Sequence, residues 1–220
     1  MTYYIGLLLS DKIIIAADRR LIKYEEGVQK HYDIFNKIAL ISKHTYFTVA
    51  GNAGSCAEIY EYLKNNNLEH IEDINNIKHE ELNDIHNKRM KTEIASIPNF
   101  EKLSNKDMYY NLSLMLGGIS RPGEPTICSM NNRNGFTPEI FHGLKCIALQ
   151  VRPEIDNISD NFIKKIIIEI DKLNKDNGSK LIKSLLKQLF LDISYKDNYI
   201  SSSFDIVIQD KNGNQSCETL

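Results

Sequence analysis

The N-terminal region alternates apolar runs with short polar turns, and this pattern predicts a buried β-hairpin. Tyr3–Leu9 and Ile13–Ala17 are β-rich and are joined by Ser10-Asp11-Lys12, a compact turn signal. The second run is apolar throughout, which predicts a strand buried on both faces. It ends abruptly at Asp18-Arg19-Arg20. These charges are therefore either the solvated end of a strand or part of a site.

A second hairpin and a helix are predicted next. Lys37–Ser42 and Thr45–Ala50 have the strand pattern, after a polar and irregular stretch at Leu21–Asn36 that predicts a loop or short strands. Ser55–Asn65 carries apolar residues at helical spacing. Gly51 falls between the strand end and the helix N-terminus, where backbone N–H groups are unpaired and the helix dipole favours negative charge. A glycine there serves either a turn or an oxyanion hole.

The remaining chain continues to alternate strands with helices. Residues 66–106 are polar, and Gly117-Gly118 is interpreted as part of a turn. The last strand is predicted at Phe204–Gln209. This order predicts one α+β domain over residues 1–220, with two sheets packed face to face and helix pairs outside. The other predicted elements are strands at Tyr110–Gly117, Thr126–Met130 and Glu139–His142, a short helix or strand at Cys146–Val151, and helices around Glu80–Glu93, at Ile158–Leu173 and at Ser179–Leu191.

Composition narrows the classes of function. The 220 residues are 42% hydrophobic and 25% charged, which is typical of a soluble globular domain. The net charge is −2 without blocks of like charge, so neither nucleic acid nor a membrane is a predicted partner. The apolar N-terminal run is too short for a signal peptide, and no run approaches the roughly 18 residues of a membrane span. Four scattered cysteines fit a reducing compartment, and a cytoplasmic protein is expected.

No motif for a cofactor or a metal ion is found. The glycines do not form a phosphate-binding loop, and no H-E-x-x-H sequence occurs. His79 and His86 are seven residues apart and could share a helix face, but this spacing does not predict a metal site. Cys56 is expected to be a small buried residue and not a nucleophile. We therefore predict no cofactor and no metal.

Thr2 follows Met1 directly and becomes the N-terminal residue once Met1 is removed. It would then carry a hydroxyl nucleophile and a free α-amine, whose pKa of about 7.7–8.0 lets it act as a base near neutral pH. Methionine aminopeptidase accepts a small second residue such as threonine, so we expect removal of Met1 without a propeptide or self-cleavage. Taken alone, Thr2 is expected to be only the start of an edge strand, and the residues that follow change this interpretation.

Four motifs in register make the chain resemble the proteasome β-subunit family and its bacterial relatives HslV and Anbu. Members share an N-terminal threonine in T-x-x-x-G, an A-A/S-D-x-R strand end, a K-I/V-x-x-I strand and an A-G-G/N-x-A turn into a helix. The opening Met-Thr-Tyr-x-x-Gly-Leu is most similar to the Anbu branch. The resemblance is strong over residues 1–65 and fair near 110–135 and 179–213. The matching residues are Thr2 with Gly6, Ala16-Ala17-Asp18-Arg19-Arg20, Lys37-Ile38-Ala39-Leu40-Ile41 and Ala50-Gly51-Asn52-Ala53.

This resemblance implies a four-layer αββα sandwich of the Ntn-hydrolase type and a threonine peptidase mechanism. Thr2 would attack a peptide carbonyl, and its own amine would carry the proton. Lys37 would stay cationic beside Thr2, oriented by Asp18. The Gly51 N–H would stabilise the oxyanion. By the same resemblance, an apolar pocket for the residue before the scissile bond is lined by Leu21, Phe35 and Val49, with Ala53 at its rim.

The chain also departs from the family pattern. The connection between Asp18 and Lys37 is longer than in common β-subunits. A supporting Gly-Ser-Gly would fall near His142-Gly143-Leu144-Lys145, which contains no serine. A second supporting motif, Asp-x-x-Ser-Gly, corresponds to Asp197-Asn198-Tyr199-Ile200-Ser201, where the serine is displaced by one and the glycine is missing. Asp197 and Ser201 are therefore either site residues or plain loop residues.

Three functions fit these observations. The first is an N-terminal threonine peptidase that cleaves peptides or unfolded proteins inside a homo-oligomeric ring or helical stack, with a possible ATPase unfoldase as partner. The second is a catalytically inactive structural subunit of such an assembly. The third is an Ntn amidase that acts on small molecules. The first residue of the mature chain, Thr2 or Met1, separates the first two functions, and a monomeric protein would favour the third.

Overall fold

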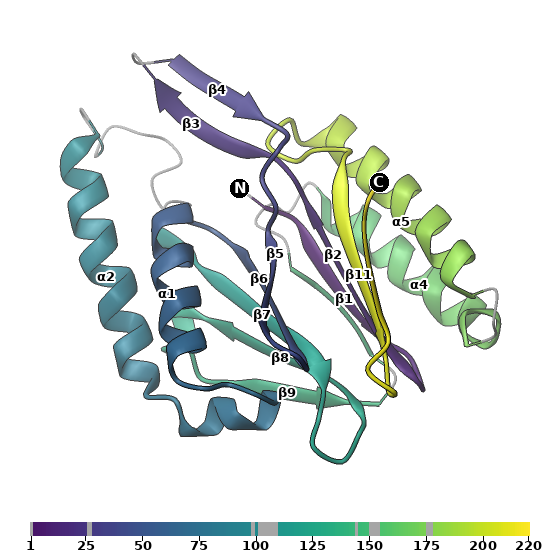
Figure 1. Ribbon diagram of the computed structural model, residues 1–220. Coiled ribbons are helices and arrows are strands. Elements are labelled where there is room, and N and C mark those ends of the chain that lie inside the picture. Colours follow the sequence, from purple (N-terminus) through teal and green to yellow (C-terminus); the bar gives the residue numbers. More distant parts are fainter. Residues whose placement is uncertain are drawn as a thin grey trace.

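Two antiparallel sheets form the centre of the molecule in the computed structural model (Figure 1). The structure describes residues 2–25, 28–97, 100, 110–143, 145–149, 155–174 and 178–220. Within these residues the first sheet has the order β10-β1-β2-β11-β12 and the second β5-β6-β7-β8-β9. The first contains β1 (Tyr4–Leu8), β2 (Lys12–Asp18), β10 (Lys145–Leu149), β11 (Phe204–Asp210) and β12 (Gln215–Thr219). The second contains β5 (Ile38–Ser42), β6 (Thr45–Ala50), β7 (Ser113–Ile119), β8 (Pro125–Asn131) and β9 (Glu139–His142).

The two sheets pack closely because glycines face the opposite sheet at two points. A Cβ at Gly6 of β1 would lie 2.6 Å from the sulfur of Met115. One at Gly117 of β7 would lie 2.6 Å from the Cδ1 atoms of Ile13 and Ile15. A side chain at either position would therefore require these neighbouring side chains to shift. The apolar cluster between the sheets includes Tyr4, Leu8, Ile13, Ile15, Met115 and Ile127.

The prediction that Gly117-Gly118 forms a turn is wrong. Both residues lie inside β7, and the turn comes after Ile119. Gly118 is also required within the strand, because a Cβ there would meet the backbone carbonyl oxygen of His44 at 1.8 Å. The sequence signal of a glycine pair thus arises here from close backbone and sheet packing.

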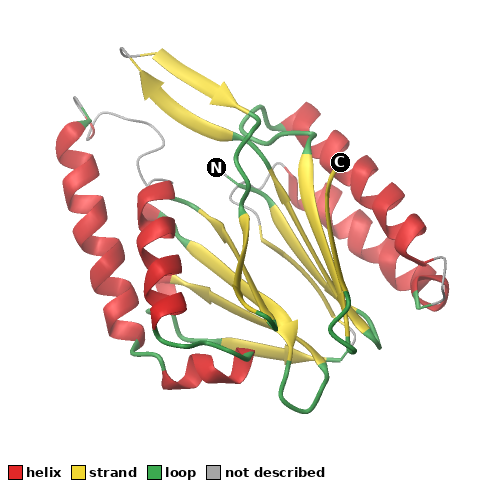
Figure 2. Cartoon of the chain, in the orientation of Figure 1, coloured by secondary structure: helices red, strands yellow, loops and turns green. Residues whose placement is uncertain are grey.

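Helices cover the outer face of each sheet, so the predicted combination of helices and sheets is confirmed (Figure 2). Ile59 and Leu63 pack with Phe47 and Leu114 of the second sheet. On the first sheet the helices contribute an apolar layer that includes Phe190, which stacks on Phe204 with ring centroids 4.3 Å apart. The helices are α1 (Ala53–Asn65), η1 (Ile71–Asn76) and α2 (His79–Ser96) on the second sheet, α4 (Asp156–Leu173) and α5 (Gly178–Lys196) on the first, and the short η3 (Asn132–Asn134).

Several predicted elements differ in detail from the structure. The stretch Leu21–Asn36 contains a hairpin, β3 (Leu21–Glu25) and β4 (Val28–Tyr32), which projects beyond the two sheets in Figure 1. Phe204–Gln209 is not the last strand, because β12 follows it and pairs with β11. Every residue of β12 is exposed, so it lacks the apolar alternation that marks a half-buried strand. No described helix is long and apolar enough to cross a membrane.

His86 gives the fold a pH-dependent contact. Its Nε2 lies 3.0 Å from the Tyr110 carbonyl oxygen, which can only accept, so Nε2 donates and Nδ1 accepts from the Ser55 hydroxyl at 3.0 Å. Burial lowers the pKa of His86, against a smaller opposing effect of the Tyr110 carbonyl. Below about pH 6.5 the unfolded chain therefore takes up a proton that the folded chain resists.

We expect the free energy of unfolding to fall as the pH is lowered from about 7 to about 5, because the folded pKa of His86 is depressed. His86→Gln should flatten this dependence, whereas His142→Gln, at an exposed position on β9, should not. Burial also lowers the pKa of His79, so some dependence should remain. Urea denaturation at each pH measures the effect. An equal pH dependence in His86→Gln and wild type would contradict it.

Candidate active site

The Asp18 carboxylate, at the end of β2, gathers groups from several segments of the chain. Its side chain is fully buried. Oδ1 accepts from the Tyr3 amide at 2.7 Å, and the Lys37 ammonium contacts both oxygens at 3.0 Å. Oδ2 also accepts from the Arg20 amide at 2.9 Å, and the Ser201 amide lies at 3.5 Å. The charge at the end of this strand is therefore a buried, paired carboxylate and not a solvated end.

Thr2 lies next to this carboxylate. The Tyr3 amide donates to the Asp18 side chain, and the Asp18 amide donates to the Tyr3 carbonyl at 3.0 Å, so Tyr3, the residue after Thr2, is held through both of its backbone groups. Thr2 is buried, with 5% of its surface exposed. It does not start an edge strand, because β1 pairs with both β2 and β10.

Lys37 stands immediately before β5 and is also buried. Burial lowers the pKa of its ammonium group, while the charge and hydrogen bonds of Asp18 act in the opposite direction. A lysine in such a place keeps its charge only with a close counter-ion, since an isolated buried charge is very costly. The carboxylate of Asp18 therefore both orients Lys37 and favours its charged form.

Residues that adjoin the four sequence motifs pack together between the sheets. Tyr4 follows Thr2 by two positions, and Ala17 precedes Asp18. Ile38 and Ala50 adjoin Lys37 and Gly51. These four neighbours belong to one buried cluster between the sheets. Ile38 of β5 pairs with Thr48 of β6, so Lys37 and Gly51 adjoin the same end of this hairpin, and Asp18 contacts both Lys37 and the Tyr3 amide. The structure thus brings Thr2, Asp18, Lys37 and Gly51 to the same end of the sheet pair, while their catalytic roles stay predictions.

Gly51 occupies a backbone position that only glycine fits. Its φ is +137°, and a Cβ would meet the Asn111 carbonyl oxygen at 2.4 Å. The next residue, Asn52, caps α1, because its side-chain oxygen accepts from the Ser55 backbone amide at 2.8 Å. The side-chain NH₂ group of Asn52 donates to the carboxylate of Glu93 of α2. The start of α1 is therefore fixed both by its cap and by the neighbouring helix.

The segment from Asp197 to Ser201 reaches the same site. Asp197 and Ser201 are both buried. Asp197 Oδ1 accepts from the Tyr199 amide at 2.9 Å, and Ser201 Oγ accepts from the Ser203 amide at 3.1 Å. Of the two, Ser201 approaches Asp18 through its backbone amide. Both residues thus belong to an ordered loop at the site, although their catalytic roles stay predictions.

Two residues that the sequence reasoning did not assign, Arg20 and Asp33, tie this loop to the site. The Arg20 guanidinium makes two hydrogen bonds of 2.7 Å to the Asp33 carboxylate, and contact with Arg20 lowers the pKa of Asp33. It also donates to the carbonyl oxygens of Asn198 at 2.6 Å and Ile200 at 3.2 Å. Arg20 stood in the A-A-D-x-R motif, whereas nothing in the polar stretch around Asp33 marked it.

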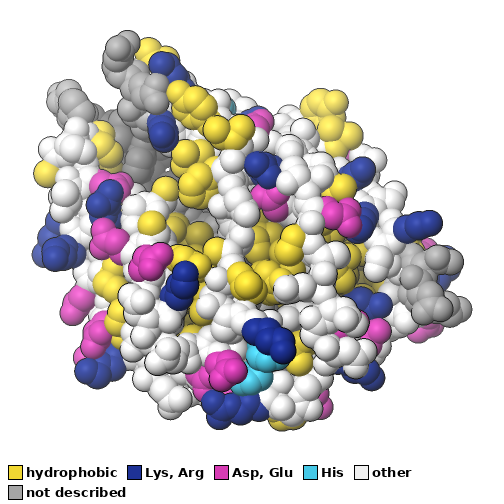
Figure 3. All heavy atoms as spheres, viewed as in Figure 1, with side chains coloured by type: hydrophobic (Ala, Val, Ile, Leu, Met, Phe, Trp, Pro, Cys, Tyr) yellow, Lys and Arg dark blue, Asp and Glu magenta, His cyan; other side chains and the backbone are white. Residues whose placement is uncertain are grey.

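The residues predicted to line a substrate pocket occupy different depths. Val49 is 7% exposed and packs beneath α1 with Cys56, Leu21 is half-buried, and Phe35 is 40% exposed. Ala53 is exposed at the first position of α1. Figure 3 shows hydrophobic side chains reaching the surface in the middle of the face viewed in Figure 1. The common role of Leu21, Phe35, Val49 and Ala53 in binding substrate stays a prediction.

The placement of a supporting element near His142-Gly143-Leu144-Lys145 is wrong. In the pairing of β1 with β10, Lys145 lies opposite Leu8 and Leu149 opposite Tyr4. Lys145 is thus about 13 Å along β1 from the end that carries Thr2. Leu149, opposite Tyr4, is the last described residue of β10, and residues 150–154 lie outside the described part. The absence of a serine at 142–145 therefore says nothing about the site.

Cys56 is buried near the site but is not a thiolate nucleophile. Burial raises the pKa of its thiol to about 12, and the nearby charge of Lys37 offsets only part of this effect. The thiol consequently stays protonated near neutral pH. This agrees with the prediction of a small buried residue.

Comparisons with known structures identify the class of fold. The Anbu complex from Pseudomonas aeruginosa, solved as a helical assembly, matches with a TM-score of 0.64 and 13% identity over 99% of this chain and 86% of that chain. Anbu from Yersinia bercovieri, described as an ancestral beta-subunit, matches with a TM-score of 0.63 and 11% identity over 98% and 86%. The fold is therefore proteasome-like.

The sequence itself matches the family model described as proteasome subunit over residues 2–134. This match covers more than half of the chain, and the chain belongs to the proteasome subunit family. No curated protein matches the sequence. The resemblance expected from the four N-terminal motifs is confirmed, including the likeness of the fold to Anbu.

Proposed function

We propose that this chain is an N-terminal threonine peptidase that acts after removal of Met1. The observation that carries the proposal is the Asp18 carboxylate, which holds the Tyr3 amide at 2.7 Å and the Lys37 ammonium at 3.0 Å. One carboxylate thus holds both a buried cation and the residue next to Thr2, which supports Thr2 as the N-terminal nucleophile. Membership in the proteasome subunit family supports the same chemistry. Helices outside both sheets support a four-layer αββα sandwich of the Ntn-hydrolase type.

The reaction proceeds through an ester on Thr2. Its Oγ1 bonds to the substrate carbonyl carbon while the hydroxyl proton passes to the α-amine. The carbonyl becomes an oxyanion that accepts from the Gly51 N–H, a contact whose loss typically costs about 2.7–4 kcal/mol. The carbonyl then re-forms, the C–N bond breaks, and the proton moves to the leaving nitrogen. Addition of water to the ester releases the acid and restores the Thr2 hydroxyl.

Lys37 affects these reaction steps through its charge. A nearby cation lowers the pKa of the Thr2 α-amine, so that more of the amine is neutral and able to accept a proton near neutral pH. Asp18 keeps Lys37 in place and offsets the effect of its burial. Arg20 has a positioning role, because it joins the loop of Asp197 and Ser201 to Asp33.

We expect the processed chain to hydrolyse fluorogenic peptides that carry an apolar residue before the scissile bond, because the side chains of Leu21, Phe35, Val49 and Ala53 are uncharged and apolar. Peptides with Asp or Glu at that position should be cleaved far more slowly, since a carboxylate would lose its hydration without a partner. A peptide library read by mass spectrometry measures the preference. Preferred cleavage after acidic residues would contradict this specificity.

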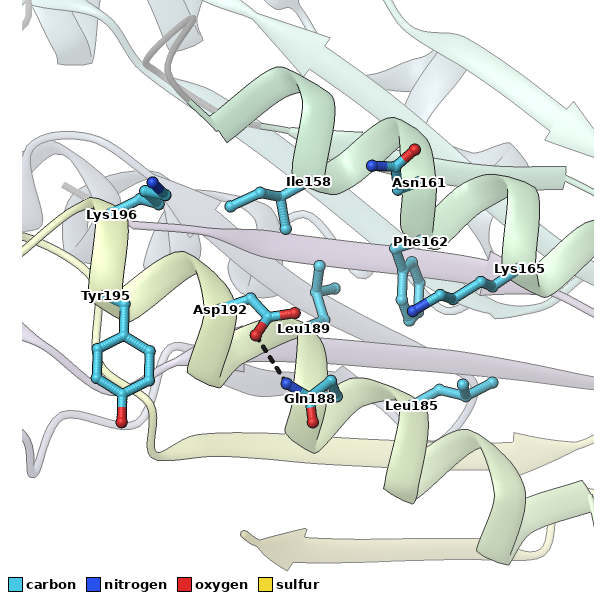
Figure 4. Close-up of a pocket in the computed structure, with 10 residues that line it drawn as sticks. All are labelled: Ile158, Asn161, Phe162, Lys165, Leu185, Gln188, Leu189, Asp192, Tyr195 and Lys196. Atoms are coloured by element: carbon cyan, nitrogen blue, oxygen red, sulfur yellow. Dashed lines mark hydrogen bonds between the residues drawn. The ribbon is translucent and has the colours of Figure 1, made fainter.

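The same proposal places the site within a homo-oligomer. A groove of about 470 Å³ runs between α4 and α5, and Ile158, Phe162 and Leu189 point into it from the two helices (Figure 4). Ile168 and Tyr195 of these helices are 77% and 80% exposed. The groove also carries the basic Lys165 and Lys196 and the acidic Asp192, so two copies could pair their charges across a two-fold axis.

We therefore expect an oligomeric particle in light scattering and not a monomer of 25.3 kDa. Tyr195→Asp and Ile168→Asp should shift the particle to smaller species, because each places a charge on the proposed apolar contact. Lys180→Asp, at the start of α5, provides a surface control. A stable monomer at micromolar concentration would contradict the assembly and favour the small-molecule amidase.

A further inference from the structure

Three side chains of metal-ligating types gather at the end of the second sheet away from Thr2. His44 lies in the turn between β5 and β6, and Glu69 and His70 precede η1. One ligand atom from each lies within 4.8 Å of the other two. Lys37 and Gly51 adjoin the opposite ends of β5 and β6, so this cluster is separate from the candidate active site.

The backbone that carries this cluster is held by side chains of the hairpin. The hydroxyls of Ser42 and Thr45 both donate to the Glu69 carbonyl, at 2.7 and 3.1 Å. The carbonyl of His44 accepts from the Ile119 amide at 3.1 Å. The segment before η1 is thereby fastened to the turn that contains His44. The backbone positions of the three residues are thus set by the fold before any ligand binds.

The orientation of His70 leaves one ring nitrogen ready to coordinate. Its Nδ1 lies 3.1 Å from the Ile119 carbonyl oxygen. A carbonyl only accepts, so Nδ1 carries the proton and the Nε2 lone pair is directed away from that contact. A histidine that binds a metal almost always donates its other N–H to such a carbonyl, which orients the ring. The His44 ring stacks on His70 with centroids 4.7 Å apart and an interplanar angle of 10°. Because the lone pairs of an imidazole lie in its ring plane, one of the two rings turns out of this stack when both bind the same ion.

We propose that His44, Glu69 and His70 bind a divalent transition-metal ion, with Zn²⁺ as the best match to two imidazoles and a carboxylate. Tetrahedral ligands about 2.0–2.1 Å from zinc are about 3.3 Å from one another. The ligand atoms are now up to 4.8 Å apart. Side-chain rotations that move these atoms by about 1–2 Å therefore bring them to the distances that zinc requires. The exposed position of Glu69 leaves room for water as a further ligand. The bound ion joins the β5–β6 turn to the segment before η1.

The test is calorimetric titration of the full chain, stripped with a chelator, with Zn²⁺ alone. Wild type should bind one ion per chain. His44→Ala and His70→Ala should each weaken binding about 100-fold, and Glu69→Gln about 10-fold. His142→Ala removes a histidine of the exposed edge strand β9 and should leave the affinity unchanged, as should Cys217→Ser at an exposed thiol. Circular dichroism checks that each variant is folded.

Hydrogen exchange of the wild-type chain gives a second measurement that needs no variant. Zn²⁺ should slow exchange at residues 42–45 and 69–73 and leave the site around Asp18 unchanged. The proposal is overturned if wild type binds no zinc, or if His44→Ala and His70→Ala keep the wild-type affinity. Loss of binding in Cys217→Ser, or zinc-dependent protection only elsewhere in the chain, would also overturn it. None of these results depends on peptidase activity.

Discussion

Asp18→Ala should lower the free energy of unfolding by about 3–5 kcal/mol, the range typical when one partner of a buried ion pair is removed. The side chain of Lys37 is only 4% exposed, and Asp18 is its partner at 3.0 Å. The variant also deprives the Tyr3 and Arg20 amides of an acceptor. Urea denaturation measures the stability. Hydrolysis should be lost as well, because Lys37 is no longer held beside Thr2.

Two controls separate the ion pair from a general effect of losing a carboxylate. Asp11→Ala removes a half-exposed aspartate whose contact with Lys12 is 3.3 Å long, and it should change stability by less than about 1 kcal/mol. The double variant Asp18→Ala with Lys37→Met should be more stable than Asp18→Ala alone, since no unpaired charge remains buried. Equal stability losses in Asp18→Ala and Asp11→Ala would contradict the paired, buried state of this carboxylate.

Thr2→Ala should reduce peptide hydrolysis by about a thousand-fold or more, because it removes the nucleophile of the proposed reaction. Folding should be little affected, since the backbone contacts of Tyr3 with Asp18 do not involve the Thr2 side chain. Thr2→Ser retains a hydroxyl on the same carbon and should keep measurable turnover. The measurement is turnover of the best peptide from a fluorogenic panel at equal protein concentration.

Turnover measurements on Thr2→Ala and the wild-type chain also distinguish an active threonine peptidase from an inactive structural subunit. Wild-type turnover that persists in Thr2→Ala would exclude Thr2 as nucleophile. A wild-type chain that begins at Thr2, assembles and still hydrolyses none of the panel would favour the inactive structural subunit. In that case the stability effect of Asp18→Ala should remain, because it depends on burial and not on turnover.

The sequence predicted those parts of the fold that rest on contiguous apolar runs. The strand from Ile13 to Ala17 and the helix after Gly51 have clear periodicity, and both are present. The strand β12 was missed because all its residues are exposed. Gly117 was misread because a glycine that permits close sheet packing looks like a turn residue in one dimension. Spacing along the chain does not report such contacts between layers.

In the candidate site too, residues in local motifs could be predicted, whereas contacts between distant segments could not. Thr2, Asp18, Lys37 and Gly51 could be predicted because each belongs to a short local motif. Arg20 and Asp33 meet only when the polar stretch between them folds back, so no local pattern indicated their pairing. The cluster of His44, Glu69 and His70 was missed for the same reason, since the search by spacing considered His79 and His86. Contacts between segments that are distant in the sequence can be identified only once the fold is known.

The most direct test of the central claim is mass spectrometry of an active preparation labelled with a peptide β-lactone, which acylates a nucleophilic hydroxyl. The proposed mechanism predicts that the unlabelled chain begins at Thr2. It also predicts one acyl adduct per chain, found by tandem spectra on Thr2, with loss of activity in proportion to labelling. An active preparation that retains Met1 quantitatively, or an inactivating adduct on any other residue, would contradict it.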